Sequence, residues 1–97
     1  MEYQISLTES AKEDITYFEV RDQRIIVSGI ISHLKADSDI RTGRKKPLRP
    51  NPIAPWELRL GRFRVFYSIE GGRRVKVVAV GYKGHNELFI RGSEVQL

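Results

Sequence analysis

Two arginines, Arg59 and Arg64, are the side chains whose types and spacing point most clearly to chemistry. They lie in the stretch 56–67, where apolar and polar residues alternate on both sides of a Gly61-Arg62 break. This pattern predicts two half-buried strands joined by a two-residue turn, which sets Arg59 directly opposite Arg64. Like charges that face each other across a strand pair are destabilising. The pair therefore suggests a negatively charged partner, because guanidinium groups bind phosphate oxygens as a fork.

The positive charge of the chain is concentrated around these arginines. The 97-residue sequence has a net charge of +5, and the segment 41–64 contains eight basic residues against Glu57 alone. Such a cluster favours nucleic acid or an acidic protein as partner, although a solvated basic loop beside a sheet edge is an alternative. The residues predicted to contact nucleic acid are Arg44, Lys45, Lys46, Arg49, Arg62 and Phe66. Phe66 could stack on a base or anchor a protein segment, or it could lie at the edge of the core under the C-terminal residues.

The composition is that of one small globular domain, residues 1–97. Hydrophobic residues make up 40% of the chain and charged residues 30%, which is typical of a soluble protein. The absence of cysteine excludes disulfides and thiolate metal sites, and we expect neither a metal nor a cofactor. The first residues are neither basic nor followed by a long apolar run. We therefore expect no signal peptide or membrane span, and a cytoplasmic protein.

The first half of the chain predicts a strand followed by two helices. Residues 3–7 alternate in polarity, and Thr8 or Ser10 offers an N-cap for a helix over about 9–18. The next apolar residues follow helical spacing and predict a second helix that ends near residue 36. Residues 37–55 contain four prolines and little periodicity, which indicates a loop.

The second half predicts a four-stranded antiparallel meander. The expected strands are 56–60, 63–70, 73–82 and 87–91. Paired glycines at 71 and 72 predict a tight hairpin, which fixes the register of the third strand. In that register the face covered by the helices consists of Leu58, Leu60, Phe63, Val65, Tyr67, Val78 and Val80. The opposite face consists of Glu57, Arg59, Arg64, Phe66, Val75, Val77 and Ala79, with Ala79 beside Arg64.

The order of strand, helix pair and meander, together with several short motifs, resembles the RelE/ParE toxin superfamily. The motifs are Lys46-Pro47-Leu48-Arg49, Leu58-Arg59-Leu60, Arg64-Val65-Phe66-Tyr67 and Val78-Ala79-Val80-Gly81-Tyr82-Lys83. The resemblance covers most of the chain and implies an α+β fold with an N-terminal strand, a two-helix hairpin and the meander. It also implies the toxin of a type II toxin–antitoxin pair. Members of the RelE branch cleave messenger RNA in the ribosomal A site, and members of the ParE branch block DNA gyrase.

The resemblance also implies roles for individual residues. Arg59, Arg64 and Lys83 match positions where the RelE pattern has basic residues. The sequence departs from that pattern at Glu57, where a second lysine is expected, and at Phe89, where the aromatic residue carries a hydroxyl. A phenylalanine cannot take part in proton transfer.

Cleavage of RNA through its own 2′-hydroxyl requires a base, an acid and positive charge at the phosphate. Arg59 and Arg64 would supply the charge, and Lys83 would add charge or act as an acid. The candidate bases are Glu57 and His85. Each has a structural alternative, because Glu57 could be a salt-bridge partner of the arginines and His85 could be a surface turn residue.

Three functions follow from the resemblance. The first is ribosome-dependent messenger RNA cleavage, the second is gyrase inhibition without nuclease activity, and the third is an antitoxin-binding module that has lost toxicity. All three imply an acidic antitoxin as partner, and we expect it to cover the basic sheet face and Phe66.

Overall fold

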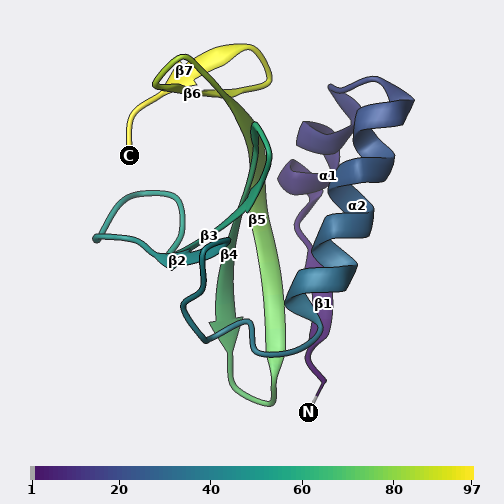
Figure 1. The fold of residues 1–97 in the computed structure, drawn as a ribbon, viewed down its shortest axis with the longest axis vertical. Coiled ribbons are helices and arrows are strands. Elements are labelled where there is room, and N and C mark those ends of the chain that lie inside the picture. Colours follow the sequence, from purple (N-terminus) through teal and green to yellow (C-terminus); the bar gives the residue numbers. More distant parts are fainter. Residues whose placement is uncertain (1) are drawn as a thin grey trace.

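Two helices cover one face of a curved sheet in the computed structural model, which describes residues 2–97. The elements follow the order β1 (Gln4–Leu7), α1 (Glu9–Thr16), α2 (Val20–Leu34), β2 (Lys45–Pro47), β3 (Trp56–Leu60), β4 (Phe63–Glu70), β5 (Arg74–Gly84), β6 (Glu87–Ile90) and β7 (Ser93–Val95). Strands β2 to β7 are neighbours in chain order, and β1 pairs with β5 in parallel. Figure 1 shows both helices on one side of the sheet, with the β2–β3 loop and the C-terminal β6–β7 hairpin on the other side. The predicted α+β class, the N-terminal strand, the helix pair and the meander are thus confirmed.

The main core lies between the helices and the sheet. Helix α1 begins after Thr8, whose side chain accepts a hydrogen bond from the backbone N–H of Ala11. Helix α2 turns Ile26, Ile30 and Leu34 inward, which is the i, i+4, i+8 spacing of one helical face. These residues pack on sheet residues such as Leu58, Val65, Tyr67 and Val80. No helix within residues 2–97 combines the length and apolar content that a membrane-spanning helix needs.

The sheet differs from the prediction in the register between β4 and β5. Phe66 pairs with Ala79 and Tyr67 pairs with Val77, so Val78 forms a β-bulge between them. Because the bulge reverses the alternation, Val75 and Val77 face the helices and Val78 faces away from them, which corrects the predicted faces. The hairpin loop is also one residue longer than expected, since Glu70 pairs with Arg74.

Residues from the first helix and its cap satisfy the backbone groups around this bulge. Thr8 Oγ1 donates to the Val78 carbonyl at 3.3 Å, and the Val80 N–H donates to Asp14 Oδ2 at 3.0 Å. A buried backbone group without a partner costs free energy. The bulge therefore depends on long-range contacts that no local pattern at residues 77–79 reveals.

Two short strands lie outside the predicted set. Strand β2 falls within the expected 37–55 loop, and β7 follows the last expected strand. Each has three residues, and β2 ends at Pro47, which cannot donate to a ladder. Pairing with longer neighbours, β3 and β6, therefore defines these strands more than their own sequence does.

A second, smaller core lies on the far side of the sheet. Phe66 and Ala79 pack there against Ala54 of the β2–β3 loop and Leu88 of β6. The C-terminal hairpin is held to α1 at its turn, where Arg91 Nε lies 2.9 Å from Asp14 Oδ1 and Arg91 Nη1 lies 2.9 Å from Glu13 Oε2. The hairpin thus closes over part of the face that the helices leave open.

The stability of the protein should depend on pH through Asp14, whose side chain is 1% exposed. Burial raises the pKa of Asp14, while the bond from Val80 and the charge of Arg91 oppose part of that rise. The folded state therefore holds this proton more tightly than the unfolded state does. The stability that Asp14 contributes is fully present below its unfolded pKa of about 3.9 and is lost as pH rises above it.

The measurement is the free energy of unfolding of the protein and of Asp14→Asn between about pH 4 and pH 7. The free energy of unfolding of the wild type minus that of Asp14→Asn should decrease as pH rises. A difference that grows with pH would mean that the ion pair with Arg91 outweighs the cost of burial.

Candidate functional site

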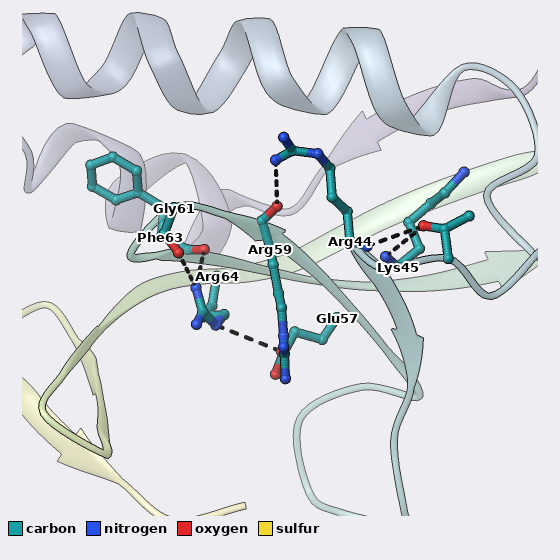
Figure 2. A network of polar contacts seen from close by, with 8 residues as sticks. Arg44, Lys45, Glu57, Arg59, Gly61, Phe63 and Arg64 are labelled. Atoms are coloured by element: carbon teal, nitrogen blue, oxygen red, sulfur yellow. Dashed lines mark hydrogen bonds and ion pairs between the residues drawn. The ribbon is translucent and has the colours of Figure 1, made fainter.

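Arg59 and Arg64 lie side by side, as predicted, on the sheet face away from the helices. They are direct partners in the β3–β4 ladder, and the guanidinium groups of both lie near the carboxylate of Glu57 (Figure 2). Glu57 Oε1 is 3.2 Å from Arg59 Nε and 3.7 Å from Arg64 Nε, and its side chain is 4% exposed. The salt-bridge alternative for Glu57 is therefore the observed arrangement. One buried carboxylate offsets the repulsion between two guanidinium groups.

The two arginines differ in how firmly they are held. Arg64 Nη1 donates to the carbonyls of Gly61 at 2.6 Å and Phe63 at 2.9 Å, so its side chain folds back along the turn. Burial lowers the pKa of Arg64, whereas the charge of Glu57 opposes that effect. The side chain of Arg64 is 13% exposed and that of Arg59 is 45% exposed. Arg59 is thus the more exposed member of the pair, and Arg64 is a fixed charge beside it.

Strand β5 adds Lys83 to the same face. Gly81 pairs with Arg64, which corrects the predicted neighbour Ala79, and Lys83 lies two residues further along. The backbone N–H of Lys83 donates to the Arg62 carbonyl at 2.8 Å, which fixes this part of β5 to the β3–β4 turn. His85 follows in the exposed β5–β6 turn, with a φ of 59°. The structure therefore brings three basic residues to one face and places His85 beyond its edge.

The basic residues of the β2 region divide between two sides of the sheet. Lys46 pairs with Glu57 in the ladder, so it lies on the arginine side. Lys46 and Arg49 line a groove of about 550 Å³ beside this face. Arg44 extends toward the helix instead (Figure 2), and its Nη1 lies 3.5 Å from the Arg59 carbonyl. The place of Lys46 opposite Glu57 could not be read from the sequence, because it depends on β2.

Two predicted nucleic-acid contacts, Lys45 and Phe66, require correction, and a third, Arg62, lies on another side of the sheet. Lys45 is buried, and its Nζ donates to the Asp37 carbonyl at 2.8 Å, so its ammonium group is held away from the surface in this structure. Phe66 is fully buried in the second core, so the interpretation of a stacking surface is wrong and the place under the C-terminal residues is correct. Arg62 forms an ion pair with Asp22 of α2 at 3.2 Å and covers the Phe63 ring at 4.6 Å. It therefore belongs to the helix side.

Phe89 also lies apart from the arginines. It pairs with Tyr82, and the two rings stack with centroids 5.3 Å apart. Tyr82 packs against the main core, where its ring meets Phe18 edge-on. The position at which the RelE pattern carries an aromatic hydroxyl is thus on the helix side of the sheet in this chain.

The fold is shared with solved structures, although no family model and no curated protein matches the sequence. A chain of the toxin–antitoxin complex RelBE2 from Mycobacterium tuberculosis is 21% identical, with a TM-score of 0.72 over 86% of this chain and 100% of that chain. A chain of the archaeal RelE–RelB complex from Pyrococcus horikoshii OT3 is 17% identical, with a TM-score of 0.68 over 88% of this chain and 99% of that chain. At such identities the likeness establishes the fold. The protein therefore has the fold of RelE chains, as its sequence motifs indicated.

Proposed function

We propose that this protein is the toxin of a toxin–antitoxin pair and that it cleaves messenger RNA on the ribosome. The observation that carries the proposal is the pair of adjacent guanidinium groups, Arg59 and Arg64, fixed over one buried carboxylate on the sheet face away from the helices. The structural neighbours, which come from toxin–antitoxin complexes, support the toxin assignment. An acidic antitoxin is the partner that this function requires.

In the proposed mechanism the arginines bind the scissile phosphate. Arg59 contacts Glu57 through Nε, so its two terminal nitrogens can donate to phosphate oxygens. These charges would stabilise the phosphorane-like transition state that forms when the 2′-hydroxyl attacks the neighbouring phosphorus. The 5′-oxygen then leaves with a proton, for which Lys83 on the same face is a candidate donor. Glu57 holds the guanidinium groups of Arg59 and Arg64 in place. Because Glu57 lies next to both, it remains a candidate base in this proposal, and His85 is the other.

Gyrase inhibition is the second candidate function, and two observations favour it. Glu57 stands where the nuclease pattern has a lysine, and it is committed to two arginines. Phe89 carries no hydroxyl and stacks on Tyr82, away from the arginine face. A toxin that binds its target without cleaving it needs neither a lysine at position 57 nor an aromatic hydroxyl at position 89.

Expression of the protein from an inducible promoter separates these functions. Messenger RNA cleavage predicts growth arrest with new transcript ends inside translated regions, and these ends should disappear when translation initiation is blocked beforehand. Gyrase inhibition predicts relaxed plasmids and intact transcripts, and that result would overturn the nuclease proposal. Normal growth with a partner still bound would leave only the antitoxin-binding function.

A further inference from the structure

Lys46 lies on the same sheet face as the arginine pair and has no ionic partner of its own. It stands directly opposite Glu57 in the β2–β3 ladder and is exposed. Among residues 2–97, Lys46 forms no ion pair with a carboxylate. The neighbouring lysine, Lys45, is buried on the other face and donates to the Asp37 carbonyl. Of these two lysines, only Lys46 therefore offers its ammonium group to a ligand on the arginine face.

Backbone hydrogen bonds on both sides of Lys46 fix its position beside β3. The Arg59 N–H donates to the Arg44 carbonyl, and the Leu48 N–H donates to the Pro55 carbonyl, both at 2.8 Å. In such a ladder the Cβ atoms of directly opposite residues lie about 5 Å apart. The short strand β2 thus holds one lysine at a defined place next to the candidate site, which is the preorganisation that a catalytic side chain requires.

The side chains of Lys46 and Arg59 can contact the same phosphate. Arg59 Nε lies 3.2 Å from Glu57 Oε1, so the Arg59 side chain turns toward the residue that Lys46 faces. Lys46 lies one strand and two residues away from Arg59, which places their Cα atoms roughly 8 Å apart. Both side chains are long and rise from one face. The groove of about 550 Å³ that Lys46 lines gives room for the nucleotide beyond that phosphate.

The strand order places a lysine on each side of the arginine pair. Strands β2 to β5 are successive neighbours, and they carry Lys46, Arg59, Arg64 and Lys83 in that order. In a phosphoryl transfer the attacking and leaving oxygens lie roughly in line. The proton is therefore taken up on one side of the phosphate and supplied on the other.

The candidate bases indicate which side supplies the proton. Glu57 is 4% exposed beneath the arginines, whereas His85 is exposed and follows Lys83 on the β5 side. A base that reaches the substrate from the β5 side leaves the β2 side for the acid. Lys46 is the exposed lysine on that side. The nearby guanidinium of Arg49 cannot take this role, because arginine does not lose its proton in proteins.

We infer that Lys46 is the general acid that protonates the leaving 5′-oxygen. The inference rests on the proposed function, because it assigns a residue to one step of RNA cleavage. The 2′-hydroxyl gives its proton to the base, and its oxygen forms a bond to phosphorus. The bond between phosphorus and the 5′-oxygen breaks, and that oxygen takes the proton from Lys46 Nζ. The products are a 2′,3′-cyclic phosphate and a 5′-hydroxyl, and Lys83 contributes charge at the phosphate.

The test measures single-turnover cleavage of ribosome-bound messenger RNA by the wild type, Lys46→Ala and Lys46→Arg. Both substitutions should lower the rate about 10²–10⁴-fold, the usual contribution of a general acid. Arginine keeps the positive charge but does not release a proton. Lys35→Ala is the matched control, since Lys35 is an exposed lysine at the C-terminal end of α2, and it should cleave at the wild-type rate.

A substrate with sulfur in place of the 5′-oxygen at the cleavage site separates proton donation from binding. A thiolate leaves without a proton, because the pKa of a thiol lies far below that of an alcohol. Lys46→Ala should therefore cleave this substrate at the wild-type rate. Arg59→Ala should stay slow on it, because the charge at the phosphate is still missing. Recovery on the sulfur substrate also shows that the Lys46→Ala protein is folded.

Three results would overturn the inference while the proposed function stands. The first is a wild-type rate for Lys46→Ala on the ordinary substrate, and the second is a wild-type rate for Lys46→Arg, which would reduce Lys46 to a charge. The third is a Lys46→Ala protein that is as slow on the sulfur substrate as on the ordinary one. Recovery by Lys83→Ala in its place would assign the donor to Lys83. A wild-type protein that does not cleave messenger RNA would contradict the proposed function itself, and the role of Lys46 with it.

Discussion

Arg59→Ala should abolish growth arrest with little change in stability, and it should reduce the rate of RNA cleavage on ribosomes about 10²–10³-fold. Arg59 is the exposed member of the pair and presents its terminal nitrogens to the phosphate. Its loss leaves Glu57 paired with Arg64, so the cost in stability should be about 1 kcal/mol. Primer extension on ribosome-bound messenger RNA measures the cleavage rate, and urea unfolding measures the stability.

Arg24→Ala is the matched control, because Arg24 is exposed on α2 and lies outside the site. It removes the same charge and should leave cleavage unchanged. A folded Arg59→Ala protein that cleaves at the wild-type rate would contradict the site assignment. Joint replacement of Arg59 and Arg64 is a poorer test, since it leaves the buried Glu57 carboxylate without a cation. That change should cost about 3–5 kcal/mol and lower activity through misfolding.

Phe66→Ala should destabilise the protein by about 3–5 kcal/mol, the usual cost of deleting a fully buried phenylalanine side chain. A domain of this size has a total stability of about 5–15 kcal/mol, so the variant would lose a large share of it. Phe66 is 0% exposed and fills the second core between the β2–β3 loop and the C-terminal hairpin. Urea unfolding followed by circular dichroism gives the value, and hydrogen exchange should rise first in β6 and β7.

Phe89→Ala provides the comparison, because Phe89 is only partly buried and stacks on Tyr82 alone among the aromatic rings of residues 2–97. Its loss should cost about 1–2 kcal/mol. Equal costs at both positions would argue against a closed second core. A Phe66→Ala protein with wild-type stability and weaker RNA binding would restore the stacking interpretation.

The β3–β4 hairpin was predictable because all its determinants are local. Strict alternation of polarity sets which residues face the core, and the Gly61 turn, with a φ of 61°, sets the register. The β4–β5 register was not predictable, because Thr8 and Asp14 satisfy the backbone of the bulge from about 70 positions away. A one-residue bulge then exchanges the faces of every residue between it and the next turn.

In the candidate site, too, the features with local determinants were predictable and those that depend on distant segments were not. The Arg59–Arg64 pairing is a consequence of the hairpin, and the Glu57 contact was one of two open alternatives. The burial of Lys45 was hidden, since it depends on a contact with the segment that follows α2. The burial of Phe66 under the C-terminal residues was likewise one of two open alternatives. Alternation states which face a residue occupies, but it does not state whether another segment covers that face.

The parallel pairing of β1 with β5 constrains when the molecule can form during its own synthesis. Gln4 pairs with Arg74 and Leu7 with Val77, so the first strand has no partner until most of the chain has left the ribosome. The helices likewise have no sheet to cover before then. Contacts of such sequence separation form late, after local hairpins. A nascent or prematurely terminated chain that stops before β5 would therefore present unpaired apolar helices to proteases and chaperones.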